Sequence, residues 1–226
     1  MFDLMALQSA VNIHGRVARV VIAAFEGSSP REVGAAMLVW GDGQSGTIGG
    51  GALEWQAAAL ARAALAFGAT RLDRQALGPA LGQCCGGVIS LLTEVYDAET
   101  VARLDLVLIA RIVPGQAQNP QDMPLAVQRV LAAARGQGAT PAPGLVQGWM
   151  IEPVTRPQRQ LWIWGAGHVG RAIVAVMAPL PGVAITWVDV ALDRFPDDRP
   201  DSVKVLPASD PSLAVALAPK DAYISC

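Results

Sequence analysis

The pattern with the clearest chemistry is the glycine motif Gly165-x-Gly167-x-x-Gly170. An apolar run ending at Trp164 precedes it. Glycines between a strand and a helix let the backbone approach a pyrophosphate at the positive end of the helix. Asp189 closes a second apolar run about 20 positions later, where a carboxylate is expected to accept hydrogen bonds from a ribose. The spacing predicts a dinucleotide-type half-fold, with the three glycines and Asp189 as nucleotide contacts.

A second glycine-rich turn, Gly49, Gly50 and Gly51, precedes a predicted helix. Its uncovered backbone N–H groups and the helix start favour an anion, although a plain flexible turn explains the glycines equally well. It is not the phosphate loop of nucleoside triphosphatases, because no lysine precedes Lys204. Glu54, in the first helical turn, is expected to interact with the helix dipole first and to act as a general base second.

Two adjacent cysteines, Cys84 and Cys85, stand between Gln83 and Gly86. Adjacent cysteines lack the spacing of zinc ligands, and the chain has only two histidines, so a structural zinc is disfavoured. A thiolate facing a soft metal, a sulfur-transfer or redox role, and two inert buried side chains all remain open. The polar and glycine neighbours favour an exposed loop.

The segment around Ser28 and Arg31 is a third candidate site, because arginine binds phosphate or carboxylate through two hydrogen bonds. The alternative is a Ser-Ser-Pro turn followed by a solvated pair of Arg31 and Glu32.

Composition limits the class of protein. Hydrophobic residues make up 52% of the chain and charged residues 16%, which favours an α/β protein with buried strands. The net charge of −2 and the scattered basic residues argue against a nucleic-acid footprint. No apolar stretch reaches membrane-spanning length, and the N-terminus does not resemble a signal peptide. Three cysteines form no disulfide framework, so we expect a cytoplasmic protein.

Periodicity predicts two domains joined at residues 155–158. In the first, residues 1–154, we expect helices at 4–13 and 125–135 and irregular chain at 69–83. A further helix follows Gly51, and its apolar face is Leu53, Ala57, Leu60, Ala64 and Phe67. Strands are expected at 17–25, 36–40, 88–96, 104–112 and 149–154.

The second domain, residues 159–226, is predicted to be Rossmann-like, with strands near Trp162, Ile185, Val203 and Tyr223. A doubly wound domain usually needs more chain, so we expect a parallel sheet truncated at its C-terminal end.

Four segments together resemble the XdhC/CoxI family, whose members are accessory proteins that mature molybdenum hydroxylases such as xanthine dehydrogenase. They are residues 27–37, 46–54, 81–87 and 163–170. The resemblance implies a cytoplasmic, self-associating protein that binds molybdopterin (molybdenum) cofactor. It protects the cofactor while a cysteine desulfurase installs the terminal sulfur, and delivers it to the hydroxylase.

The resemblance also implies site residues. The cofactor phosphate would lie at the glycine-rich helix start, Cys84 and Cys85 would face molybdenum, and Ser28, Arg31, Glu54, Gln83 and Gly86 would line the same site. Such a protein is a carrier and not an enzyme. The alternatives are a NAD(P)-dependent oxidoreductase and a nucleotide-sensing module. The sequence contains no evident proton-relay group, which argues against the oxidoreductase. Both would use the second domain, and Asp189 would favour NAD over NADP.

Overall fold

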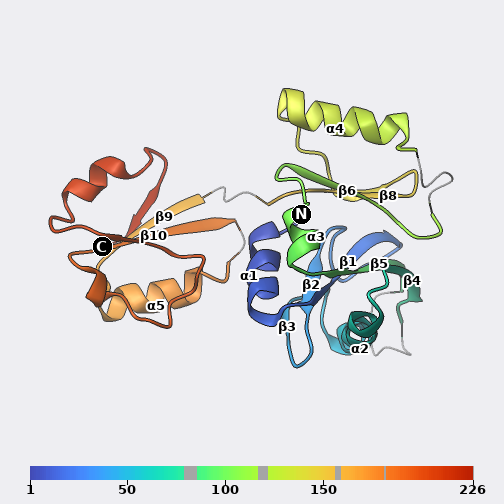
Figure 1. Cartoon of the computed structure of the whole chain (residues 1–226), viewed down its shortest axis with the longest axis horizontal. Coiled ribbons are helices and arrows are strands. Elements are labelled where there is room, and N and C mark those ends of the chain that lie inside the picture. Colours follow the sequence, from blue (N-terminus) through green and yellow to red (C-terminus); the bar gives the residue numbers. More distant parts are fainter. Residues whose placement is uncertain (79–85, 117–121, 156–158, 181, 226) are drawn as a thin grey trace. The chain divides into compact units, whose positions relative to one another are not determined.

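The computed structural model describes residues 1–78, 86–116, 122–155, 159–180 and 182–225 (Figure 1). Its contacts divide the chain into two compact units, Met1–Val154 and Thr155–Cys226. Each unit has its own sheet and its own core, and each is described separately below.

The centre of the first unit is a five-stranded antiparallel sheet with strand order β3-β2-β1-β5-β4 (Figure 1). Its strands are β1 (Val17–Glu26), β2 (Ala36–Val39), β3 (Gln44–Gly46), β4 (Arg71–Ala76) and β5 (Val88–Tyr96). The prediction of irregular chain at 69–83 was wrong for β4, an edge strand that pairs with β5. Three of its six residues are charged, so apolar alternation did not mark it as a strand.

Helix α2 (Gly51–Phe67) covers one face of this sheet. Alternate residues of β1, namely Ala18, Val20 and Ile22, point into the core under α2. The predicted helix face was partly wrong, because Leu60 and Phe67 are exposed. The helix instead buries a row of small residues with Leu53, namely Ala57, Ala58, Ala61 and Ala64. Small side chains let the helix lie close to the sheet.

The rest of the first unit adds helices and a smaller antiparallel sheet, ordered β6-β8-β7. The elements are α1 (Leu4–His14), α3 (Ala98–Ala102), β6 (Leu108–Ile112), α4 (Leu125–Gln137), β7 (Gly144–Val146) and β8 (Trp149–Pro153). Helix α4 packs on the small sheet through Val127 and Leu131. The strand predicted at 104–112 begins only at Leu108, because Asp105 accepts backbone hydrogen bonds there and forms a turn.

A buried ionic cluster joins the two sheets of this unit. Arg19 on β1 donates two hydrogen bonds to Glu152 on β8, at 2.9 and 2.7 Å. Arg111 on β6 donates to Glu152 at 2.5 Å and to Glu94 on β5 at 2.7 Å. Burial disfavours the ionised form of Glu152, but the two guanidinium groups outweigh it and lower its pKa to about 2. The cluster therefore fixes how the sheets pack.

The second unit is a four-stranded parallel sheet with strand order β11-β10-β9-β12. Its elements are β9 (Arg159–Trp164), α5 (His168–Met177), β10 (Val183–Asp189), η2 (Leu192–Arg194), β11 (Lys204–Pro207), η3 (Leu213–Leu217) and β12 (Tyr223–Ser225). Helix α5 packs on one face and η3 on the other. The predicted class, an α/β chain ending in a Rossmann-like parallel sheet, is confirmed.

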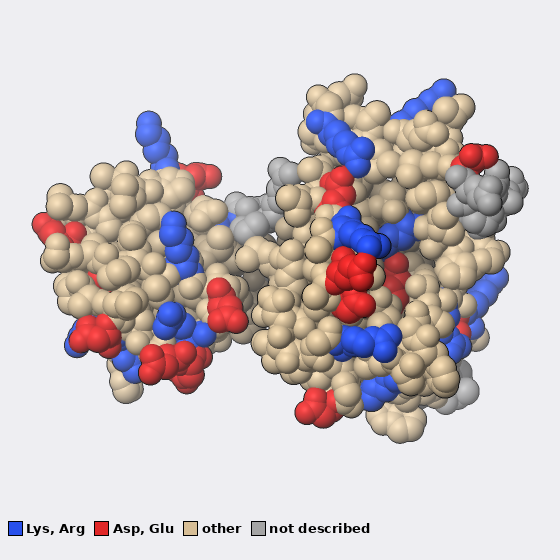
Figure 2. All heavy atoms as spheres, viewed as in Figure 1, with Lys and Arg blue, Asp and Glu red and all other residues tan. Residues whose placement is uncertain are grey.

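Surface character is mixed. Over the face of the molecule in Figure 2, acidic and basic side chains of the described residues are interspersed among uncharged ones. Among those same residues, no helix combines the length and apolar character needed to cross a bilayer.

Candidate functional site

Three loops that are distant in sequence meet at one end of the five-stranded sheet. The first follows β1, the second precedes α2, and the third precedes β5. A methyl group placed on Gly87 would lie 2.2 Å from the Ser28 carbonyl oxygen, and one on Gly49 would lie 2.5 Å from the Pro30 Cβ. Glycine is needed at both positions because only a hydrogen fits between the loops. The fold thus brings two of the predicted site segments, and the end of a third, into one cluster.

Glu54 organises the loop before α2. Its Oε2 accepts hydrogen bonds from the Thr47 hydroxyl at 2.6 Å and from the backbone N–H groups of Ile48 and Gly50, both at 3.1 Å. Its Oε1 accepts one hydrogen bond, from Gln44 Nε2 at 3.0 Å. The Glu54 carboxylate therefore accepts hydrogen bonds from backbone N–H groups that the sequence analysis expected to bind an anion.

Sequence reasoning missed Gln44 and Thr47 as members of this site. Thr47 also accepts a hydrogen bond from the Gly49 N–H at 3.1 Å. A hydroxyl two positions before the glycines and a carboxylate in the first helical turn are a local signal that could have indicated the arrangement. Gln44 gave no such signal, because it reaches Glu54 from strand β3.

The loop after β1 has its own internal bonds. The Ser29 hydroxyl donates to the Arg31 carbonyl at 2.7 Å. Arg31 donates two hydrogen bonds to its neighbour Glu32, both at 3.0 Å, and this pairing lowers the pKa of Glu32 to about 2. Both side chains are exposed, so water competes with the pair and a ligand can do so too. Ser28 lies in the same loop, with its carbonyl facing Gly87.

Gln83, Cys84 and Cys85 lie outside the described residues. Gly86, which follows them directly, is exposed, and Gly87 is buried against the loop after β1. Within the described ranges, no group of three histidine, cysteine or acidic side chains is placed to hold a metal ion. The predicted metal contact of the two cysteines stays a prediction.

The Gly165 loop of the second unit is closed by its own residues. Asp189 accepts hydrogen bonds from the backbone N–H of Ala166 at 2.5 Å and of Val190 at 2.6 Å, and it is only 7% exposed. Burial opposes its ionisation, but the two donors and the nearby Arg194 lower its pKa. The carboxylate predicted to bind a ribose thus holds the loop in this structure, and its contact with a ribose stays a prediction.

Packing around this loop is equally tight. The Trp187 indole donates to the Gly165 carbonyl at 3.0 Å, and Arg171 Nε donates to the Ala166 carbonyl at 2.9 Å. A methyl group on Gly170 would lie 1.9 Å from the Gly165 oxygen, so Gly170 serves helix–strand packing. A methyl group on Gly167, the residue before α5, would meet no atom within 4 Å.

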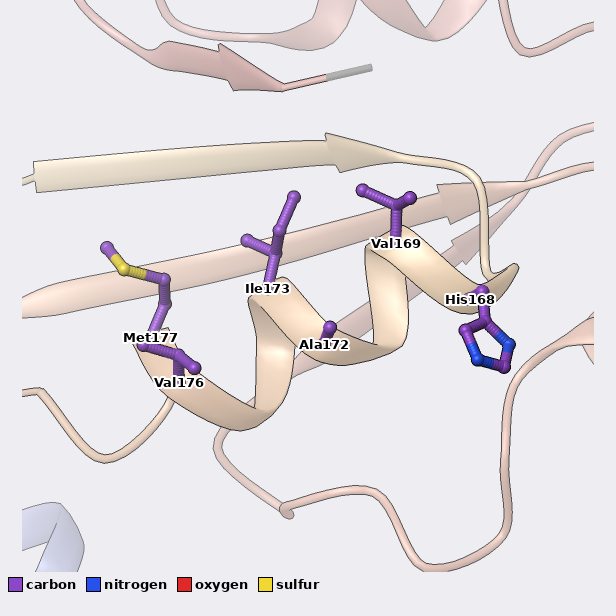
Figure 3. A pocket seen from close by; sticks show the side chains of 6 residues that line it. All are labelled: His168, Val169, Ala172, Ile173, Val176 and Met177. Carbon is purple, nitrogen blue, oxygen red and sulfur yellow. The ribbon is translucent and has the colours of Figure 1, made fainter.

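A shallow groove of about 490 Å³ lies along α5 (Figure 3). His168 is its polar residue, and the others are apolar: Val169, Ala172, Ile173, Val176 and Met177. The groove includes neither Asp189 nor the motif glycines, so it is separate from the predicted nucleotide contacts.

Fold and site together define a two-unit α/β protein with a glycine-loop cluster in its first unit and a Rossmann-like second unit. Residues 11–75 match the XdhC and CoxI family model, and the resemblance inferred from the sequence is thereby confirmed. The match includes two of the three clustered loops, those with Arg31 and Glu54. No curated protein matches the chain.

A crystal structure described as a xanthine dehydrogenase from Bacillus halodurans is similar to the whole fold. The TM-score is 0.63 at 18% identity, and the alignment covers 99% of this chain and 74% of that one. At this identity the likeness concerns the fold, and it includes both units.

Proposed function

We propose that the chain binds molybdenum cofactor, protects it during sulfuration, and delivers it to a molybdenum hydroxylase of the xanthine dehydrogenase type. The observation that carries the proposal is the meeting of three loops at one end of the five-stranded sheet. Two of them fall within the family match, and the third continues from Cys84 and Cys85. A cofactor carrier needs such a cluster, because its cargo has polar ring atoms, a phosphate and a soft metal centre to be contacted at once.

In this proposal the protein is a carrier and not a catalyst. Its partners are the hydroxylase, a cysteine desulfurase and a second copy of the chain, and its compartment is the reducing cytoplasm, where Cys84 and Cys85 stay as thiols. Metal contact by these two thiolates is part of the proposal. The NAD(P) alternative has less support, since Asp189 is buried and its carboxylate holds the backbone of its own loop.

The test uses the full chain and cofactor released from a molybdoenzyme. We expect bound molybdenum by elemental analysis, a pterin fluorescence signature after oxidation, slower cofactor decay, and faster reconstitution of an apo-hydroxylase. A double Cys84→Ser, Cys85→Ser variant should lose molybdenum retention, whereas Cys226→Ser, the third cysteine, is the matched control and should keep it.

A wild-type protein that neither protects the cofactor nor speeds reconstitution overturns the proposal. Saturable NADH binding without molybdenum favours the oxidoreductase instead.

A further inference from the structure

Helix α2 is apolar on the side that faces away from the sheet as well as on the side that packs against it. Of its 17 residues, only Glu54 and Arg62 are charged. A surface helix normally carries charged and polar residues on its outer side, whereas a helix that is apolar all round is normally buried. The side away from the sheet, here called the outer face, consists of exposed residues at helical spacing: Trp55, Ala59, Ala63, Ala66 and Phe67.

Two aromatic residues stand at the ends of this outer face. The exposed fraction of Trp55 is 74%, and that of Phe67 is 86%. Aromatic side chains are enriched in the cores of protein interfaces, and contiguous apolar patches on a surface mark sites of association. The outer face of α2 therefore has the composition of a surface that binds another protein.

The order of large and small residues along the outer face identifies that protein as a second copy of the chain. An aromatic residue at each end encloses two alanines, and positions 55 and 67, like positions 59 and 63, are equally far from Ala61. In an antiparallel pair of α2 helices with a two-fold axis level with Ala61, each Trp55 lies level with Phe67 of the other copy. Ala59 then lies level with Ala63, and side chains this small let two helices approach closely.

Charge and area are compatible with such a pair. The outer face itself is uncharged, so two copies can meet there without burying a charge, and Arg62 lies at its edge, half-buried. An aromatic side chain buries about 150–250 Å², so Trp55 and Phe67 of one copy offer roughly 300 Å² at their exposed fractions. With the alanines, two copies bury about 1,000 Å², which is the lower limit for a specific interface.

We propose that two copies of the chain associate through the outer face of α2, as an antiparallel pair of helices related by a two-fold axis. The proposed function names a second copy as a partner, and this inference assigns the surface. It rests on α2 and not on cofactor binding. In the pair, Phe67 of the second copy lies level with Trp55, one helical turn from the glycine-rich loop.

The test measures association of the full chain by sedimentation velocity, without cofactor and under reducing conditions, so that no disulfide can join two copies. Wild type should show a reversible monomer–dimer equilibrium. Ala59→Lys and Ala63→Glu each place an unpaired charge at the centre of the pair, and both positions are exposed in the single chain, so circular dichroism should stay unchanged. We expect each variant alone to raise the dissociation constant at least about 30-fold.

A mixture of the two variants tests the antiparallel register. In a mixed dimer, the new lysine of one chain lies level with the new glutamate of the other, while the opposite end of the pair keeps two alanines. We expect the mixed dimer to be at least about tenfold tighter than either variant alone. No gain in affinity on mixing would overturn the proposed pairing.

Two double variants form the matched comparison. Trp55→Ser with Phe67→Ser should abolish the dimer. Val169→Ser with Val176→Ser removes two exposed apolar side chains from α5, at 67% and 69% exposure, and should leave the dimer unchanged. A wild type that stays monomeric, or a dimer that survives the α2 changes, would overturn the inference. So would burial of Trp55, followed by its fluorescence, only on addition of an apo-hydroxylase, which would assign the outer face to that partner.

The two proposals can fail separately. A dimer that Ala63→Glu dissociates, but that does not protect the cofactor, overturns the carrier function and leaves this inference standing. Cofactor protection by a wild type that is monomeric overturns this inference alone.

Discussion

The chain contains two glycine-rich loops that precede helices, one before α2 and one before α5, and each is bonded to a carboxylate of its own. Before α2, Glu54 comes from the helix it helps to begin and accepts from Ile48 and Gly50. Before α5, Asp189 comes from the neighbouring strand β10 and accepts from Ala166 and Val190.

The difference between the loops is accessibility. Asp189 is buried and each of its oxygens accepts one backbone hydrogen bond, and the Trp187 indole donates to the Gly165 carbonyl. Glu54 is partly exposed, so solvent reaches its carboxylate. Similar glycine patterns thus form a closed structural turn in one unit and an open, ligand-accessible turn in the other. The comparison teaches that the groups filling the loop donors, more than the glycines, decide what such a loop does.

The largest effect is expected for Gly170→Ala, which tests whether the second loop is closed by packing. The new methyl would lie 1.9 Å from the Gly165 oxygen, so we expect a loss of more than about 4 kcal/mol and failure of the second unit to fold. Hydrogen exchange in β9 and β10 reports the loss. Gly167→Ala, in open space with an ordinary backbone angle, should change stability by less than about 0.5 kcal/mol. Equal effects of the two substitutions would contradict the packing account.

The same amide substitution in both loops sharpens the comparison. Asp189→Asn replaces one acceptor by an N–H group facing a buried backbone donor, which should cost about 1–3 kcal/mol. Glu54→Gln should cost at most about 1 kcal/mol, because water can reach the donors it abandons. Urea unfolding followed by hydrogen exchange within each unit measures both. A larger cost at Glu54 would show that the first loop is the closed one.

Acidity provides a third test of the second loop. The folded-state pKa of Asp189 is lowered, so its stabilisation is complete above the unfolded pKa near 3.8 and is lost as the pH falls through the lower folded value. The stability difference between wild type and Asp189→Asn should therefore shrink from pH 4 to pH 2 in urea titrations. A difference that grows on acidification would be incompatible with the lowered pKa.

The smallest effect is expected for Glu32→Gln, beside the open loop. The pair of Arg31 and Glu32 is exposed, and such pairs contribute less than about 0.5 kcal/mol. Thermal unfolding at low and moderate salt should show no clear change. A loss above about 1 kcal/mol would mean that Arg31 is held in place and not available to a ligand.

Sequence patterns with a short range were sufficient for much of the fold. Strand β5 was predicted with both its ends. Elements β9, α5 and β10 were predicted from the apolar run that ends at Trp164, the three motif glycines after it, and the second apolar run that Asp189 closes. These elements are determined locally, because side-chain periodicity and backbone freedom depend on neighbouring residues. Edge strand β4 was missed because its charged residues hide the alternation.

The chain by itself therefore determined its elements, its class and the residues available for chemistry. Only the tertiary structure decided which of those residues meet. The Gly87 backbone reaches the Ser28 carbonyl because β1 and β5 pair with Glu26 opposite Val88, and Asp189 reaches Ala166 because β9 and β10 lie side by side. Such contacts join residues far apart in sequence, and their geometry is set by strand register and packing, which no local pattern encodes.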